Sequence, residues 1–129
     1  MTATADDERA IRALIDAWIG ATNAGDLAKV RSLMADDVVF MVPGKAPFGA
    51  EAFETTARGL ENTRIHAEAD VREVAVLGDW AWCQTHLTVT MTPPDAPPNV
   101  RNGYALSILY KHPQRGWIVA RDANLIAPA

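Results

Sequence analysis

One carboxyl in this sequence has a setting in which acid–base chemistry is expected. Asp122 lies within the run 117–126, which is otherwise mostly apolar and has the composition of a strand. A carboxyl surrounded by apolar groups has a raised pKa, so it can exchange protons near neutral pH. The structural alternative is a carboxylate paired with Arg121 or with a neighbouring strand. Because successive strand residues point to opposite faces, at most one of Arg121 and Asp122 faces inward.

Three further side chains could take part in such chemistry, and each has a structural alternative. Asn124 shares the Asp122 face and could orient a carbonyl or enolate oxygen, or it could hydrogen-bond at a sheet edge. Tyr104 could donate a hydrogen bond to an oxyanion, or it could be a core residue whose hydroxyl reaches water. His86 could act as a base because its ordinary pKa lies near neutrality. However, its strand face also carries two tryptophans, which favours an outer-face or dimer-interface role.

Several other kinds of chemistry find no support in the sequence. It contains no G-x-S-x-G nucleophile motif, no G-x-G-x-x-G string and no phosphate-binding P-loop. The histidines His66, His86 and His112 are far apart, and neither H-x-x-x-H nor C-x-x-C occurs. We therefore expect no metal site and no bound cofactor.

The bulk composition is that of one soluble globular domain. The chain has 129 residues, which we assign to a single domain spanning 1–129. A net charge of −4 and scattered Lys and Arg argue against a nucleic-acid partner. No apolar run approaches the roughly 20 residues needed to span a bilayer, so no membrane partner is expected. Cys83 is the single cysteine, so no internal disulfide can form and a reduced, cytoplasmic setting is expected.

The first half of the chain has the pattern of three helices and one short strand. Apolar residues at helical spacing predict a long helix over 5–24 that Gly25 ends. A shorter helix follows from Asp26, with an inner face that runs as far as Met34. The β-branched and aromatic run 38–42 predicts a strand. A third helix is expected over 50–60, with Phe53 on its apolar side.

The second half has the pattern of four long strands. Apolar alternation over 65–76 slips by one residue near Arg72 and Glu73, which predicts a β-bulge and a bent sheet. Gly78 and Asp79 predict a tight hairpin turn. Further strands are expected over 80–91, 100–111 and 117–126. Helices followed by a run of strands indicate an α+β fold, with the helices packed in the concave side of a curved antiparallel sheet.

The strand 80–91 has two faces of different character. Trp80 and Trp82 share one face and are too apolar for a fully solvated surface, so we expect that face to be buried in a homodimer. The opposite face carries smaller residues. Among them is Cys83, which we expect to be an inert core thiol.

Several strings resemble those of a known superfamily. The opening helix pair, residues 10–35, runs into Leu-Met-Ala-Asp-Asp-Val at 33–38. The chain closes with Gly-Tyr-Ala-Leu-Ser-Ile-Leu-Tyr-Lys at 103–111 and Gly-Trp-Ile-Val-Ala-Arg-Asp-Ala-Asn at 116–124. Together with the order of elements, these strings resemble the superfamily of nuclear transport factor two and ketosteroid isomerase, with its SnoaL-like members. The closing strings resemble the SgcJ/EcaC family most closely.

The resemblance implies a cone-shaped, cystatin-like fold with a deep, mostly apolar pocket between the helices and the concave sheet. It also implies a dimer formed through the outer sheet face. Five residues would then line the pocket, although the pattern of each favours a place in a packed core: Trp18, Phe40, Phe53, Leu106 and Ile108.

The sequence also departs from the pattern of the ketosteroid isomerases. Their catalytic base lies on the first strand, a few residues after an Ala-Asp-Asp string, and Val42 falls at about that position here. An apolar side chain cannot take a proton. Steroid isomerisation by that mechanism is therefore not expected.

These observations leave three hypotheses about function. The first is a cofactor-free isomerase, cyclase or dehydratase that acts on a small hydrophobic molecule of secondary metabolism, with Asp122 as the acid–base group. The second is a protein that binds such a molecule without proton transfer. The third is an interaction module whose dimer face is its function. The enzyme needs an inward titratable group with a polar partner within reach, whereas the module predicts a filled interior.

Overall fold

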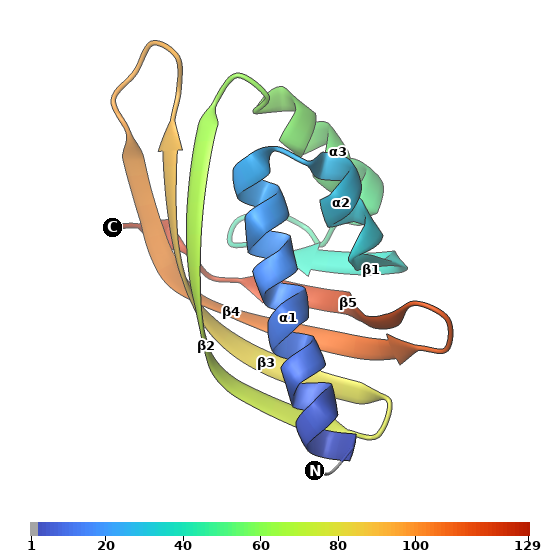
Figure 1. Ribbon diagram of the computed structural model, residues 1–129. Helices are drawn as coiled ribbons and strands as arrows, with labels where there is room; N and C mark the ends of the chain where they lie inside the picture. The colour runs from blue at the N-terminus through green and yellow to red at the C-terminus, as the bar shows by residue number, and fades with distance from the viewer. Residues whose placement is uncertain (1–2) are drawn as a thin grey trace.

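The computed structural model describes residues 3–129 and shows helices first and long strands after them, as the sequence predicts (Figure 1). The helices are α1 (Ala3–Ala24), α2 (Leu27–Ser32) and α3 (Ala50–Gly59). The strands are β1 (Met34–Met41), β2 (Arg64–Leu77), β3 (Trp80–Thr92), β4 (Asn99–His112), β5 (Gly116–Asn124) and the short β6 (Ala127–Pro128). None of the helices described is long and apolar enough to cross a membrane.

The strands form one sheet in the order β1-β5-β4-β3-β2, with β6 paired to β4. Figure 1 shows this sheet curving around α1, with α2 and α3 beside the C-terminal part of α1 and next to β1. The neighbours β2–β3, β3–β4 and β4–β5 are antiparallel, which follows from their short connections. The predicted α+β fold, with helices against a curved sheet, is confirmed.

The first strand differs from its predicted form in two ways. It begins at Met34, so the residue expected at the end of the second helix is already in the sheet. It also runs parallel to β5, in a sheet expected to be antiparallel throughout. Both differences have one cause, because β1 lies beside a strand from the far end of the chain. The Val119 N–H donates to the carbonyl of Leu33, and Met34 is paired with Val119 and fully buried.

The helix α1 supplies the largest part of the helical side of the core. Ile11, Leu14 and Ile15 are buried at the helical spacing seen in the sequence. The amino-terminal turn of α1 is held by Asp7, whose carboxylate accepts from the Lys111 ammonium at 2.8 Å and from the Trp117 indole at 3.1 Å. These two bonds attach the start of the helix to β4 and β5.

Two local predictions for the second strand are confirmed. The pairing of β2 with β3 shifts register between Val71 and Glu73, which is the predicted β-bulge. The hairpin that joins these strands turns at Gly78, where a φ of +67° suits a residue without a Cβ. The bulge bends β2 around α1 (Figure 1).

The faces of β4 are the reverse of those expected for its large apolar residues. Leu106 and Ile108 are 45% and 39% exposed on the outer face, while the inner face carries the buried Ala105, Ser107 and Leu109. The reason is register, because paired residues of neighbouring strands lie on the same face of a sheet. Gln84 pairs with Leu106, and Trp82 with Ile108, which puts both aliphatic residues on the tryptophan side.

The free edge of β2 is covered by side chains from α1. The Asn23 amide donates to the Ala67 carbonyl at 3.0 Å and accepts from the Ala67 N–H at 2.6 Å. The Arg12 guanidinium donates to the Val71 carbonyl at 3.3 Å. An uncovered edge strand exposes backbone groups that can pair with another chain. Asn23 therefore replaces the neighbouring strand that Ala67 lacks on this side.

We predict that Asn23→Ala lowers the free energy of unfolding by about 1 to 2 kcal/mol, because both backbone groups of Ala67 lose their protein partner. Urea denaturation of the two proteins would measure the difference. Asn62→Ala, in an exposed turn, is the matched control and should change stability by less than about 0.5 kcal/mol. Equal losses in the two variants would contradict the role given to Asn23.

Candidate functional site

The Asp122 side chain lies on the inner face of the sheet. On β5 it is paired with Ser107 of β4 on one side and with Phe40 of β1 on the other, and all three share that face. Arg121 points the opposite way, and its guanidinium donates to the Asp37 carbonyl at 3.0 Å. The sequence left open which of the two residues faces inward. In the structure Asp122 faces the helices and Arg121 does not. Asp122 as a whole residue is half-buried, and its carboxyl lies deep enough for burial to dominate its electrostatics.

Among residues 3–129, the Asp122 carboxyl has one hydrogen-bond partner, the hydroxyl of Ser107. The Ser107 Oγ donates to Asp122 Oδ1 at 2.7 Å. Burial raises the pKa of Asp122 above the ordinary value of a carboxyl, and the hydrogen bond from Ser107 opposes part of that rise. The result is a group that holds its proton at a higher pH than a surface aspartate does, which is the property needed in a general acid–base.

Two more small polar side chains continue from Ser107 along the inner face. Cys83 is paired with Ser107 across β3 and β4 and is fully buried, which raises the pKa of its thiol and keeps it neutral. Thr85 follows on the same face of β3 at 3% exposure, and its hydroxyl has no hydrogen-bond partner among the described residues. Neither Ser107 nor Thr85 was proposed for the site from the sequence. Strand alternation could have indicated them. Thr85 is two residues from Cys83 on β3, and Ser107 is two residues from Ala105 on β4, so each pair shares one face.

An aromatic cluster lies at the β1 side of Asp122. The Phe40 ring stacks on Phe53 with centroids 4.9 Å apart and on Phe48 at 5.6 Å. The Trp18 ring meets Phe40 at 6.3 Å and Phe53 at 6.1 Å. Three predicted lining residues are thus together, on α1, β1 and α3. Trp18 and Phe53 are partly exposed, so this apolar wall next to the carboxyl is not completely packed.

Asn124 is on the inner face with Asp122, one pair of residues farther along β5. It is paired with Ala105, whose small side chain lies between Asn124 and β3. Its carbonyl Oδ1 accepts from the N–H of Ile126 at 3.0 Å. The amide oxygen is therefore occupied locally, and the amide nitrogen is the atom of Asn124 that can donate to another group.

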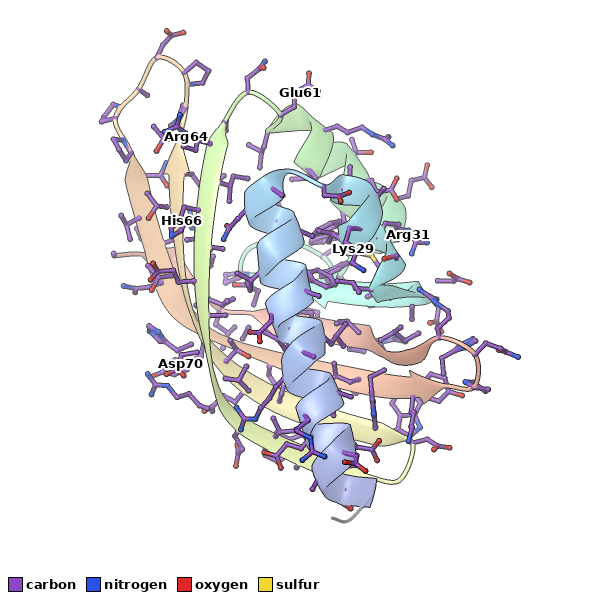
Figure 2. The ribbon with its side chains drawn as sticks, viewed as in Figure 1. Lys29, Arg31, Glu61, Arg64, His66 and Asp70 are labelled. Atoms are coloured by element: carbon purple, nitrogen blue, oxygen red, sulfur yellow. The ribbon has the colours of Figure 1, made fainter. Side chains whose placement is uncertain are left out.

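The other two candidate catalytic residues lie on the outer face, away from Asp122. His86 is paired with Tyr104 across β3 and β4, and their rings meet edge to face with centroids 5.1 Å apart. Tyr104 is 47% exposed there, so the expectation that it serves an inner pocket as an oxyanion donor is wrong. His86 lies on the outer face, as predicted from the face that it shares with Trp80 and Trp82. Arg64, His66 and Asp70 of β2 also point outward on this side (Figure 2).

The expected inner lining by Leu106 and Ile108 is also wrong. Both lie instead around an open apolar hollow of about 460 Å³ on the outer face, and Trp80 is 49% exposed beside them. The residues that line this hollow come from three neighbouring strands: Leu77, Trp80, Ala81, Trp82, Leu106 and Ile108. These large apolar side chains form a continuous exposed patch on the outer face.

A second, more polar hollow of about 970 Å³ lies between α2 and α3. Arg31, on α2 in Figure 2, lines it and is ion-paired with Glu54 at 3.2 Å and Asp36 at 3.9 Å. Asp122 lines neither hollow. Within residues 3–129 there is no group of three or more His, Cys, Asp or Glu side chains that could hold a metal ion.

The comparison with known families agrees with this architecture. Residues 11–121 match the SnoaL-like domain family. The chain belongs to this family. No curated protein matches this SnoaL-like chain.

Solved structures extend this assignment of fold. The SnoaL-like chain is 36% identical to a conserved protein from Planctomyces limnophilus, with a TM-score of 0.93, and the match covers 96% of this chain and 98% of that one. A ketosteroid isomerase-like protein from Erwinia carotovora atroseptica is 24% identical with a TM-score of 0.75 over 90% and 92% of the two chains. A nuclear transport factor two-like protein from Novosphingobium aromaticivorans is 22% identical with a TM-score of 0.72 over 94% and 82%. It is described as having a cystatin-like fold, which confirms that expectation.

We predict that Asp122→Asn changes the pH dependence of stability. The pKa of Asp122 is raised by folding, so this carboxyl contributes stability below its unfolded pKa of 3.8 and loses it as pH rises through the folded pKa. The asparagine can still accept from Ser107 but cannot ionise. Relative to the wild type, the variant should therefore gain stability as pH rises above the unfolded pKa of 3.8 and toward the raised folded pKa.

Urea denaturation at a series of pH values would test this difference. Asp95→Asn, in the exposed loop between β3 and β4, is the matched control because it removes one carboxyl of similar charge from a solvated site. Parallel stability curves for wild type and Asp122→Asn would show that folding leaves the proton affinity of Asp122 unchanged.

Proposed function

We propose that the protein binds a small hydrophobic molecule against the inner face of the sheet and transfers a proton on it through Asp122 without a cofactor. One observation carries this proposal: an inward carboxyl has a hydroxyl partner at 2.7 Å and an aromatic wall beside it. Such a pair distinguishes an acid–base site from a simple apolar binding site. The reaction class is that of a cofactor-free isomerase, cyclase or dehydratase.

The chemistry follows from the two states of the carboxyl. As carboxylate, Asp122 takes a proton from carbon next to a carbonyl, the C–H bond breaks, and its electron pair enters the enolate of the ligand. As carboxylic acid, it returns the proton to another carbon, or to a leaving hydroxyl in a dehydration. The amide nitrogen of Asn124 is the inner-face donor available for the enolate oxygen. The role first considered for Tyr104 falls to this group, because the tyrosine is on the other face.

The principal alternative is a binding protein that uses the same apolar wall without proton transfer. It would need Trp18, Phe40 and Phe53 but not the ionisation of Asp122. The narrower SgcJ/EcaC assignment and a place in secondary metabolism remain part of the proposal. They rest on the closing strings 103–111 and 116–124.

Proton transfer can be tested without knowing the natural substrate. A panel of small enolisable hydrophobic ketones in D2O would be followed by proton NMR for loss of the signal next to the carbonyl. We expect the wild type to accelerate exchange for some ketones and Asp122→Asn to lose that acceleration by at least about 100-fold. Asp95→Asn should exchange like the wild type. Ketones that bind, by saturation-transfer NMR, but exchange no faster than in buffer would favour the binding protein.

We also propose that the outer sheet face pairs with a second copy of the chain. Four large apolar side chains there are exposed: Leu77 at 68%, Trp80 at 49%, Leu106 at 45% and Ile108 at 39%. They lie on the adjoining strands β2, β3 and β4, while farther along β2 the outer face is polar (Figure 2). A patch shared by identical copies is self-complementary under two-fold symmetry. The patch explains why β4 directs its aliphatic residues away from the helices.

The dimer proposal predicts that Ile108→Arg yields a monomer, because it places a charge in the centre of the apolar patch. Size-exclusion chromatography with light scattering at micromolar concentration would compare the masses with the 14.0 kDa of one chain. Thr56→Arg, exposed on α3 in the other layer, is the matched control and should leave the dimer intact. A monomeric wild type would refute the proposal.

A further inference from the structure

The two oxygens of the Asp122 carboxyl are in different situations. Oδ1 accepts the hydrogen bond from Ser107, whereas Oδ2 has no hydrogen-bond partner among the residues that the structure describes. The carboxyl is buried enough for desolvation to raise its pKa, while the residue as a whole is half-buried. A carboxyl with one oxygen held and one free can turn only a limited amount about its terminal bond. The free oxygen is then the atom presented to whatever lies against the inner face.

Ser107 is well placed to hold that oxygen still. It is 5% exposed and lies in the middle of β4, with strands hydrogen-bonded on both of its sides. Its pairing with Asp122 on β5 and with Cys83 on β3 fixes where the Cβ lies. The position of the hydroxyl is therefore set by the sheet and not by a loop.

The neighbours of Ser107 leave its hydroxyl proton for Asp122. A serine hydroxyl has one proton to donate and two lone pairs to accept with. The Cys83 thiol next to it stays protonated because burial raises its pKa, so it does not compete as an anion. Cys83 is also a side-chain hydrogen-bond partner of Ser107, but as a neutral thiol it can donate its S–H to a lone pair of the Ser107 oxygen and leave the hydroxyl proton free. The single proton of Ser107 is thus committed to Oδ1.

We propose that Ser107 is the positioning residue of this site, holding Oδ1 of Asp122 so that Oδ2 is the atom that exchanges a proton with the ligand. The proposal rests on the proposed acid–base function of Asp122. A hydroxyl donor stabilises a carboxylate more than a carboxylic acid. Ser107 therefore also sets the pH at which Asp122 changes from acid to base, and it does so without contacting the ligand.

The chain contains a natural control for this role. Thr85 is another buried hydroxyl on the inner face, but it is on β3, two strands away from Asp122, and makes no hydrogen bond to it. Thr85→Val removes one buried hydroxyl from the inner face, just as Ser107→Ala does. A purely general effect of polarity would shift Asp122 in both variants, whereas positioning by Ser107 shifts it in one.

The test is a carboxyl-carbon NMR titration of the full chain labelled at its aspartate side chains, with Asp122 assigned by the loss of its signal in Asp122→Asn. We expect Ser107→Ala to move the titration midpoint of Asp122 upward by about one pH unit, since a hydrogen bond to the anion is lost. Ser107→Thr, which restores a hydroxyl, should return the midpoint toward that of the wild type. Thr85→Val should leave it unchanged.

The outcomes separate this inference from the proposed function. An Asp122 midpoint that is the same in wild type and Ser107→Ala would overturn the positioning role, even if Asp122 drives proton exchange in ketones. The same follows if Thr85→Val shifts the midpoint as far as Ser107→Ala. A shift in Ser107→Ala alone, with no exchange in any ketone, would support the hold on Oδ1 and reject the catalytic function. Where exchange is found, Ser107→Ala should lower kcat more than it changes KM and move the pH profile upward.

Discussion

Strand pairing decides which side chains of this protein meet the helices, because residues paired across neighbouring strands must lie on the same face. The register of β3 with β4 joins Trp82 to Ile108 and Cys83 to Ser107. One side of the central sheet is therefore built from large apolar residues and the other from small ones. The small side receives α1 and the aromatic cluster, and it is also where a hydroxyl can lie next to Asp122. The surroundings of Asp122 and the apolar outer patch are consequences of one register.

Much of the fold could be predicted from local patterns. The long first helix, the bulge after Val71, the hairpin at Gly78 and the order of the strands each depend on residues close together in sequence. The parallel pairing of β1 with β5 could not be predicted in this way. It joins Met34 to Val119, and nothing near either residue indicates a partner so far along the chain. The early start of β1 was missed for the same reason, since Met34 also fits the apolar stripe of a helix.

The candidate site was predicted in part, and the failures have a physical cause. Asp122 could be found because a lone acid in an apolar strand is conspicuous, and Trp18, Phe40 and Phe53 because helix and strand patterns place them inward. Alternation shows that two sets of residues in a strand face opposite ways, but it does not say which set faces the core. The usual assumption gives the larger apolar set to the core. In β4 both faces carry apolar residues. That assumption therefore placed Leu106 and Ile108 inside, and it missed Ser107, which is the residue on the inner face.

The parallel pair β1–β5 also constrains the order in which the molecule can assemble. As the chain leaves the ribosome, the helices and β1 are made long before β5, so the strand beside β1 has to wait for its partner. The meander of β2, β3 and β4 joins neighbours in sequence and can pair early, whereas contacts between distant segments form slowly. Asp122 meets Ser107 and Phe40 only when β5 has entered between β4 and β1. The surroundings of the Asp122 carboxyl are therefore completed by the same step that closes the sheet.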